Sequence, residues 1–164
     1  GRWGKIAKKM MDEYNLKPNS KILDIGCGKG FLLHDFKKID PSFEVYGLDI
    51  SQYAIDNSKE EIKNNLTQGN ASSLPFKNDY FDLVISINTL HNLYNYELLP
   101  SLKEIERVGK KNKYICVESY RDEKEKVNLL YWQVTCEGFY TPEEWKWWFE
   151  QAKYTGDHSF IYFE

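Results

Sequence analysis

The stretch Asp24-Ile25-Gly26-Cys27-Gly28-Lys29-Gly30 decides the fold predicted for this chain. It follows an apolar segment, 21–25, that is typical of a short strand, and it precedes a segment with helical apolar spacing, 31–38. Glycines at alternate positions let the backbone turn sharply and approach a ligand with no Cβ in the way. The stretch therefore predicts a strand, a ligand-binding turn and a helix, and a plain structural turn is the less favoured interpretation.

Strands and helices alternate on both sides of this unit. Further strands are predicted at 43–48, 67–70, 81–87, 113–118 and 159–163, with helices at 2–15, 51–64, around 98–105 and from Thr141 onward. The segment 81–87 is apolar throughout, which is typical of a central strand in a parallel sheet. The alternation predicts an α/β fold: a Rossmann-like, doubly wound, mostly parallel sheet of six or seven strands with helices on both faces.

The length of 164 residues predicts a single domain over 1–164, and the start at Gly1-Arg2-Trp3, without Met, is interpreted as a trimmed N-terminus. The net charge of -3 lacks the basic stripe typical of nucleic-acid binders. No apolar run approaches the roughly 18 residues of a membrane span. Cys27, Cys116 and Cys136 have no metal-binding or redox spacing. We therefore expect a cytoplasmic protein without metal, nucleic-acid or membrane partners, of undetermined oligomeric state.

Asp49 ends the next predicted strand, 21 residues after Gly28. An acid at this place accepts hydrogen bonds from both hydroxyls of a ribose. The dinucleotide fingerprint needs the spacing GxGxxG, whereas here the third glycine is Gly30 and Phe31 stands where the last glycine would be. A nucleoside-containing ligand is therefore predicted, and a nucleotide-dependent oxidoreductase is the weaker alternative.

Two later segments complete the pattern: 69–76 before the strand Phe81-Asp82-Leu83-Val84, and Asn88-Thr89-Leu90-His91-Asn92-Leu93 after it. Together with the glycine turn and Asp49, they resemble the class I S-adenosylmethionine-dependent methyltransferases, especially the small-molecule group, over about residues 17–120. The resemblance implies transfer of a methyl group from S-adenosylmethionine to an oxygen or nitrogen of a small molecule, leaving S-adenosylhomocysteine. The expected acceptor is a small metabolite or a sugar of surface-polysaccharide biosynthesis.

The same resemblance implies a cofactor site, position by position. It places Asp24, Gly26, Gly28 and Gly30 around the methionine moiety, Asp49 on the ribose, Ile50 against the adenine, Asn70 and Ala71 at the adenine edge, and the backbone carbonyl of Asn88 on the methionine ammonium. Asn70 departs from the family, which usually has Asp there, so its contact with the adenine amino group is expected to be weaker.

Four residues at the ends of predicted strands are candidates for the chemistry. His91 is the leading candidate for a general base, because it follows the central strand; a loop histidine held by its neighbours is the alternative. Glu118, Tyr120 and Arg121 follow the fifth strand, and Arg121 either holds an anionic substrate group or pairs with a nearby acid such as Asp122.

An aromatic region precedes the last helix and contains Tyr131, Trp132, Phe139 and Tyr140. The resemblance implies a lid over the acceptor, and an ordinary packing cluster is the alternative. A third possibility for the whole chain is a non-catalytic scaffold or partner subunit that keeps the fold. The joint presence of Asp24, Gly28 and Asp49 argues against it, because a scaffold does not need them together.

Overall fold

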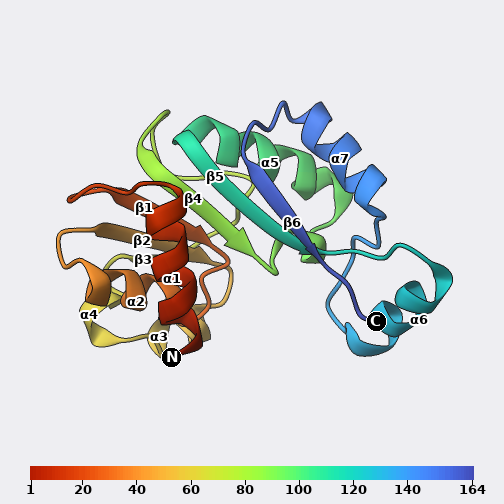
Figure 1. The fold of residues 1–164 in the computed structure, drawn as a ribbon, viewed down its shortest axis with the longest axis horizontal. Coiled ribbons are helices and arrows are strands. Elements are labelled where there is room, and N and C mark those ends of the chain that lie inside the picture. Colours follow the sequence, from red (N-terminus) through yellow and green to blue (C-terminus); the bar gives the residue numbers. More distant parts are fainter.

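Six parallel strands form the centre of the protein, whose computed structural model describes residues 1–164. The strands are β1 (Lys21–Ile25), β2 (Glu44–Asp49), β3 (Leu66–Gln68), β4 (Phe81–Ile87), β5 (Gly109–Glu118) and β6 (Asp157–Ile161). They lie in the order β3-β2-β1-β4-β5-β6 and form one sheet, in which every neighbouring pair is parallel (Figure 1). The strand order reverses between β1 and β4, and ligands of doubly wound sheets bind at that place.

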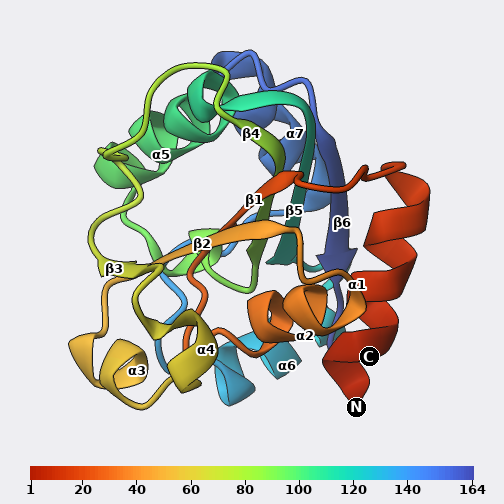
Figure 2. The same ribbon diagram turned by 90° about the vertical axis from the view of Figure 1, so that its left-hand side faces the viewer.

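Helices cover both faces of the sheet. They are α1 (Arg2–Glu13), α2 (Phe31–Ile39), α3 (Gln52–Asp56), α4 (Glu60–Lys63), α5 (Asn95–Val108), α6 (Glu123–Trp132) and α7 (Pro142–Gln151), with one 3-10 turn, η1 (Leu90–Asn92). Figure 2 shows α1 and α2 on one side of the sheet and α5 and α7 on the other. None of these helices combines the length and the apolar character needed to cross a membrane.

Alternate residues of the central strands β1 and β4 enter opposite halves of the core. Ile22 packs in the cluster on the α2 side, whereas Leu23 packs in the cluster on the α5 side. Both side chains are fully buried, and burying an aliphatic side chain of this size stabilises the fold by about 1.5–3 kcal/mol. These central strands are therefore apolar on both faces, as the segment 81–87 predicts.

The predicted α/β sheet is confirmed with six strands, but the single helix predicted over 51–64 is wrong. Two short helices, α3 and α4, occupy this segment. The side chain of Asn57 donates to the carbonyl oxygen of Tyr53, and the hydroxyl of Ser58 donates to that of Ile55. These side chains bond carbonyls at the end of α3, which is how Asn and Ser interrupt helices. Ser51 caps the start of α3, and its Oγ accepts the N–H of Ala54 at 3.2 Å.

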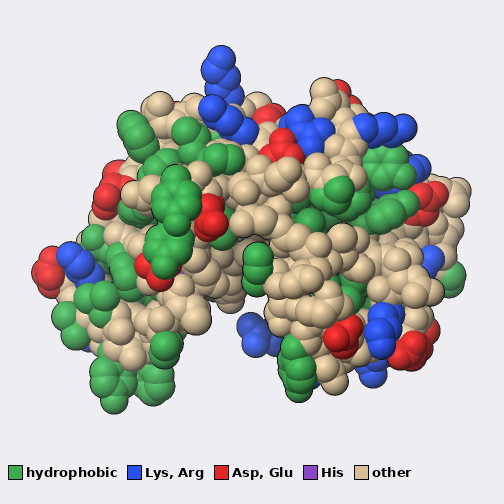
Figure 3. Space-filling view, turned by 180° about the vertical axis from the view of Figure 1, so that it is seen from behind, with side chains coloured by type: hydrophobic (Ala, Val, Ile, Leu, Met, Phe, Trp, Pro, Cys, Tyr) green, Lys and Arg blue, Asp and Glu red, His purple; other side chains and the backbone are tan.

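The region after β5 also differs from the sequence-based expectation. The residues 123–132 form α6, a helix that no pattern in the sequence indicated. Its apolar residues do not form one face, and Tyr131 and Trp132 at its end are 78% and 67% exposed. In Figure 1, α6 stands beyond the end of β5, away from the sheet, next to the C-terminus. This helix and the segments α3 and α4 form two lobes, and Figure 3 shows the molecule hollowed between them.

Candidate functional site

The glycine turn after β1 is held in a backbone conformation that only glycine adopts easily. Gly26, Gly28 and Gly30 have φ angles of 77°, 55° and 73°. A Cβ on Gly26 would lie 1.9 Å from Oγ1 of Thr89, so no side chain fits there. A Cβ on Gly28 would meet no protein atom within 4 Å. Gly28 thus leaves open space above the turn, which is the space that a bound ligand needs.

Gly30 has a different position from the other two glycines. Its missing Cβ points at the side chain of Ile62 in α4, at 2.5 Å. Gly30 also begins α2 as its N-terminal cap residue. It therefore contributes close packing between α2 and α4, and its predicted contact with the methionine moiety stays a prediction.

Asp49 anchors the turn from the end of β2. Its carboxylate accepts the N–H of Gly28 at 2.8 Å and the N–H of Ser51 at 2.9 Å. Each oxygen makes one of these bonds, and a carboxylate has about four acceptor sites in all. Asp49 is therefore held in place by the backbone and retains capacity for the two hydroxyls of a ribose.

Asp24 is a buried carboxylate with no hydrogen-bond donor from the chain. It is 6% exposed, and it lines a cavity of about 280 Å³ together with Gly26, Gly28 and Asn88. Burial, with a smaller contribution from the nearby charge of Asp49, raises the pKa of Asp24 to about 8. An unpaired buried acid is costly. Its cost is offset when a cation binds, so Asp24 marks the place for a positively charged ligand group.

The turn after β4 adds a free acceptor to the same cavity. Asn88 has the left-handed φ of 57°, and its N–H donates to the carbonyl oxygen of Cys116 at 2.9 Å. Its own carbonyl oxygen accepts no hydrogen bond within the chain. Asn88 and Asp24 thus present two acceptors to one cavity, which fits an ammonium group.

A second cavity, of about 410 Å³, continues from the glycine turn toward β3. Asp49, Ile50, Asn70 and Ala71 line it, and the side chain of Ile50 is 70% exposed. An exposed apolar side chain beside a ribose-binding acid suits the face of an adenine ring. Asn88 and Gly26 line both cavities, so the two form one continuous cleft.

The polar edge of this second cavity contains a residue that the sequence analysis missed. Oδ1 of Asn70 already accepts the N–H of Ser72 at 2.9 Å, and its amide nitrogen lies 3.5 Å from Oε1 of Glu97. Glu97 lines the cavity from the first turn of α5 and supplies the carboxylate that Asn70 lacks. The two residues are 27 positions apart, so only the packing of α5 brings them together.

His91 and Glu118 form a buried pair. His91 is 2% exposed, and its Nε2 lies 3.3 Å from Oε2 of Glu118. The other ring nitrogen, Nδ1, faces the backbone N–H of Glu118 at 3.4 Å. Burial lowers the pKa of His91 to about 4 and raises that of Glu118 to about 7. The imidazole is therefore neutral at physiological pH and lies inside the protein; its role as a general base stays a prediction.

Segments after α6 close over this pair. The second carboxylate oxygen of Glu118 accepts the side-chain N–H of Gln133 at 2.6 Å. The backbone carbonyl of His91 accepts the N–H groups of Glu137 and Gly138, both at 2.8 Å. These bonds attach the segment between α6 and α7 to η1, whose last residue, Asn92, lines the cleft.

The remaining candidates lie further out. Arg121 forms a bidentate contact with Glu125, pairs with Glu164 and stacks on the ring of Tyr162 at 3.9 Å. Its guanidinium is thus engaged by acids of the chain, although Asp122, named as a partner from the sequence, is not one of them. Tyr120 is half-buried, with Lys126 5.4 Å from its ring centre. Catalytic roles for both residues stay predictions.

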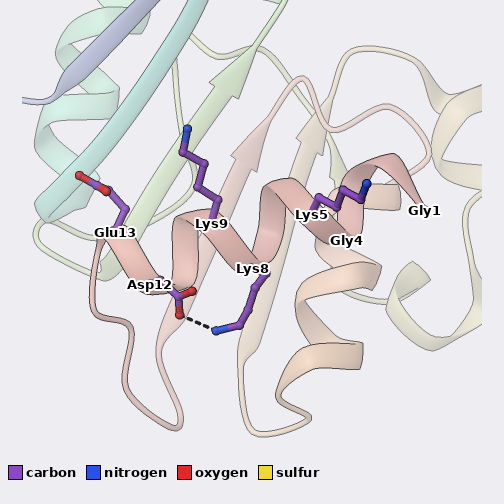
Figure 4. A pocket seen from close by; sticks show the side chains of 7 residues that line it. All are labelled: Gly1, Gly4, Lys5, Lys8, Lys9, Asp12 and Glu13. Carbon is purple, nitrogen blue, oxygen red and sulfur yellow. Dashed lines mark hydrogen bonds and ion pairs between the residues drawn. The ribbon is translucent and has the colours of Figure 1, made fainter.

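A hollow larger than either cavity of the cleft lies elsewhere, along the outer side of α1. It measures about 860 Å³, and all seven residues that line it are polar, charged or glycine and belong to α1 or precede it (Figure 4). Its only ion pair, Lys8–Asp12 at 2.6 Å, is more than half exposed. A solvated helix face of this kind offers a ligand neither enclosure nor convergent groups. The cleft between the glycine turn and Glu97 is therefore the candidate site.

Comparison with known proteins identifies the family of this chain. Residues 16–153 match the profile of the methyltransferase domain family. The chain belongs to this family, and its sheet, with helices on both sides, is the class I fold of S-adenosylmethionine-dependent methyltransferases.

One curated relative is similar to this chain in sequence, and two solved structures are similar to it in fold. The demethylmenaquinone methyltransferase of Anoxybacillus flavithermus is 35% identical over 125 residues, covering 71% of this chain and 51% of the relative. The YcgJ protein of Bacillus subtilis superposes with a TM-score of 0.70 at 22% identity, over 89% of this chain and 66% of that one. A methyltransferase of Aquifex aeolicus superposes with a TM-score of 0.64 at 23% identity, over 89% and 78% of the two chains. This chain spans about half the length of the curated relative.

Proposed function

We propose that this chain binds S-adenosylmethionine in the cleft and transfers its methyl group to a small-molecule acceptor. The observation that carries the proposal is the carboxylate of Asp24, which is buried without a donor beside an open left-handed glycine turn. The methionine end of S-adenosylmethionine carries an ammonium group, which is the partner that Asp24 and the carbonyl of Asn88 lack. Family membership implies the same cofactor.

The residues of the cleft match the parts of this cofactor. Asp49 would hold the ribose, Ile50 the face of the adenine, and Glu97 together with Asn70 the edge of the adenine. When bound, the cofactor supplies a methyl group on a sulfonium, which is already strongly electrophilic. The chain then has to hold the acceptor next to the methyl group, and orientation alone removes roughly 7–11 kcal/mol of a barrier.

The acceptor is the less determined part of the proposal. The sequence predicts an oxygen or nitrogen nucleophile on a small metabolite or a sugar. The curated relatives are named for demethylmenaquinone, a quinone. A sugar and a quinone are both small molecules, so we propose a small-molecule acceptor. The two cases to separate are a sugar acceptor and an acceptor with an aromatic ring.

Calorimetry with S-adenosylhomocysteine and with NADH tests the cofactor. We expect S-adenosylhomocysteine to bind and NADH not to bind. The dinucleotide turn requires the spacing GxGxxG, and Phe31 stands at the position of its last glycine. At 100 times the dissociation constant, the bound ligand should stabilise the fold by about 2.7 kcal/mol and raise its melting temperature. Binding of NADH alone would favour an oxidoreductase, and binding of neither ligand would favour a scaffold.

Asp24→Asn, with Asp12→Asn as its matched control, shows whether the ligand uses the cleft. Asp12 lies on the outer side of α1 (Figure 4) and is 59% exposed. We expect the Asp24 variant to lose at least tenfold in affinity, because a hydrogen bond to a charged group contributes about 1.5–3 kcal/mol. The control should bind like the unmodified chain. Equal affinities in all three proteins would contradict the proposed site.

A further inference from the structure

An apolar pocket of about 450 Å³ lies between α1 and the strands β4, β5 and β6. Eight of its twelve lining residues are hydrophobic, among them Trp3, Ile6, Ile87, Tyr114, Cys116 and Ile161. Its volume lies within the range of about 300–1,000 Å³ that is usual for small-molecule sites. Unlike the polar outer side of α1, this inner side therefore has the enclosure and the apolar surface of a binding pocket.

The pocket adjoins the cleft. Asn88 lines it and both cavities of the cleft, and Trp3 and Ile87 line it and the cavity beside Asp24. The shared residues surround the end of the cleft in which Asp24 and the carbonyl of Asn88 fit an ammonium group. A molecule in the pocket would therefore lie next to the methionine end of a cofactor, which is the end that carries the methyl group.

The two tyrosine hydroxyls on the pocket walls already have partners, and Asn88 lies at the side of the pocket that faces the cleft. The hydroxyl of Tyr114 bonds to that of Ser159, and the hydroxyl of Tyr14 donates to Oδ2 of Asp157 at 2.9 Å. What these tyrosines offer a ligand is therefore their rings. A sugar here would bury several hydroxyls without partners, at a cost of about 1–3 kcal/mol each. A flat aromatic molecule would instead stack on the rings of Trp3 and Tyr114.

Charged residues occur only at the mouth of the pocket. Arg2, Lys9 and Glu13 are exposed on α1. Figure 4 shows Lys9 and Glu13 pointing away from Lys8, toward the opposite side of the helix. The charges thus surround the entrance and leave the interior apolar.

We propose that the pocket beneath α1 is the acceptor site, and that it takes a flat aromatic molecule. This proposal rests on the proposed function, because it places the acceptor relative to the cofactor cleft. The other apolar surface near the cleft, at the end of α6, is open to solvent: Val134 is 97% exposed. That surface is the rival location for the acceptor.

Binding of 1-naphthol and of glucose tests the proposal, measured by calorimetry on the chain saturated with S-adenosylhomocysteine. The variants Ile161→Trp and Ile6→Trp fill the pocket from opposite walls, and neither residue lines the cleft. Val134→Trp adds the same side chain to the rival surface. We expect 1-naphthol to bind and glucose not to bind, and both pocket variants to lose at least about tenfold in affinity, the equivalent of 1.4 kcal/mol. Val134→Trp should bind 1-naphthol normally.

The possible outcomes separate the two proposals. If S-adenosylhomocysteine itself does not bind, the proposed function fails. If it binds equally well to all the proteins but the pocket variants keep their affinity for 1-naphthol, the acceptor site is wrong. A loss confined to Val134→Trp would move the acceptor to α6, and preference for glucose would overturn the aromatic class. If both pocket variants bind S-adenosylhomocysteine like the unmodified chain, a loss of affinity for 1-naphthol is not caused by misfolding.

Discussion

The glycine turn and the His91–Glu118 pair lie on the same edge of the sheet, yet they are built in different ways. The turn consists of neighbours in sequence, and its backbone is bonded to the ends of β1 and β2, as in the bond from the N–H of Gly28 to Asp49. In the pair, His91 belongs to a 3-10 turn and Glu118 to the end of a strand 27 residues later in the sequence. Gln133, from a third segment, bonds to Glu118 and covers the pair. The turn leaves Asp24 without a partner, whereas Glu118 faces His91 and Gln133. The turn is thus open to a ligand, whereas the pair is enclosed by the chain, although Oε2 of Glu118 is buried without a hydrogen-bond partner.

Gly26→Ala should have the largest effect on the first region. The left-handed backbone costs a non-glycine residue about 1–2 kcal/mol, and the overlap of its Cβ with Thr89 adds about 1–3 kcal/mol. Urea denaturation should show the lower free energy of unfolding. Gly28→Ala is the control, since its Cβ meets no protein atom and only the backbone cost of about 1–2 kcal/mol remains. Equal losses in the two variants would mean that contact with Thr89 does not restrict Gly26.

Asp49→Ala should weaken S-adenosylhomocysteine binding by about 1.5–3 kcal/mol for each ribose hydrogen bond lost. Because the carboxylate also holds the N–H groups of Gly28 and Ser51, a smaller loss of stability should accompany the loss of affinity. Calorimetry measures the first effect and thermal unfolding the second. Affinity within twofold of the unmodified chain would remove Asp49 from the ribose site.

His91→Ala separates catalysis from structure in the second region. It removes a buried imidazole that lies 3.3 Å from Oε2 of Glu118, and the loss of this packed side chain should lower the free energy of unfolding by about 0.5–3 kcal/mol. If His91 is a general base, the variant should also transfer methyl groups about 10²-fold more slowly or worse, with unchanged affinity for the cofactor. Because burial lowers the pKa of His91 to about 4, the rate should rise near pH 4 in the unmodified chain and not in the variant. A full rate with an unchanged pH profile would leave His91 a structural role.

Asp24→Asn should change how stability depends on pH. Burial raises the pKa of Asp24 to about 8, so the folded chain without ligand binds this proton more tightly than the unfolded chain. Its contribution to stability is complete below the unfolded pKa, about 4, and is lost as the pH rises through about 8. The variant should lose less stability than the unmodified chain over this window, by at least about 1.4 kcal/mol, the equivalent of one pKa unit. Parallel curves from urea denaturation at pH 4, 6 and 8 would contradict the raised pKa.

The sequence predicted the sheet because its signals are local. Apolar runs such as 81–87 and the turn of alternating glycines depend on residues within one element, and all six strands were found close to their predicted places. The prediction of one helix over 51–64 was wrong because the side chains of Asn57 and Ser58 bond to backbone carbonyls and end α3. In the sequence, this signal is weaker than the helical spacing of the apolar residues. The helix α6 was missed because most of its apolar residues are exposed and follow no period.

The sequence by itself determined the class of this protein, since glycine at left-handed positions and an acid at the end of the next strand suffice to specify the turn and its anchor. The tertiary structure alone decided which side chains complete the site. Glu97 reaches Asn70 because α5 packs beside β4, and the apolar pocket exists because α1 lies alongside strands that are distant in sequence. Such contacts depend on the order in which strands pair and on the faces that helices cover, and no local pattern of residues records either.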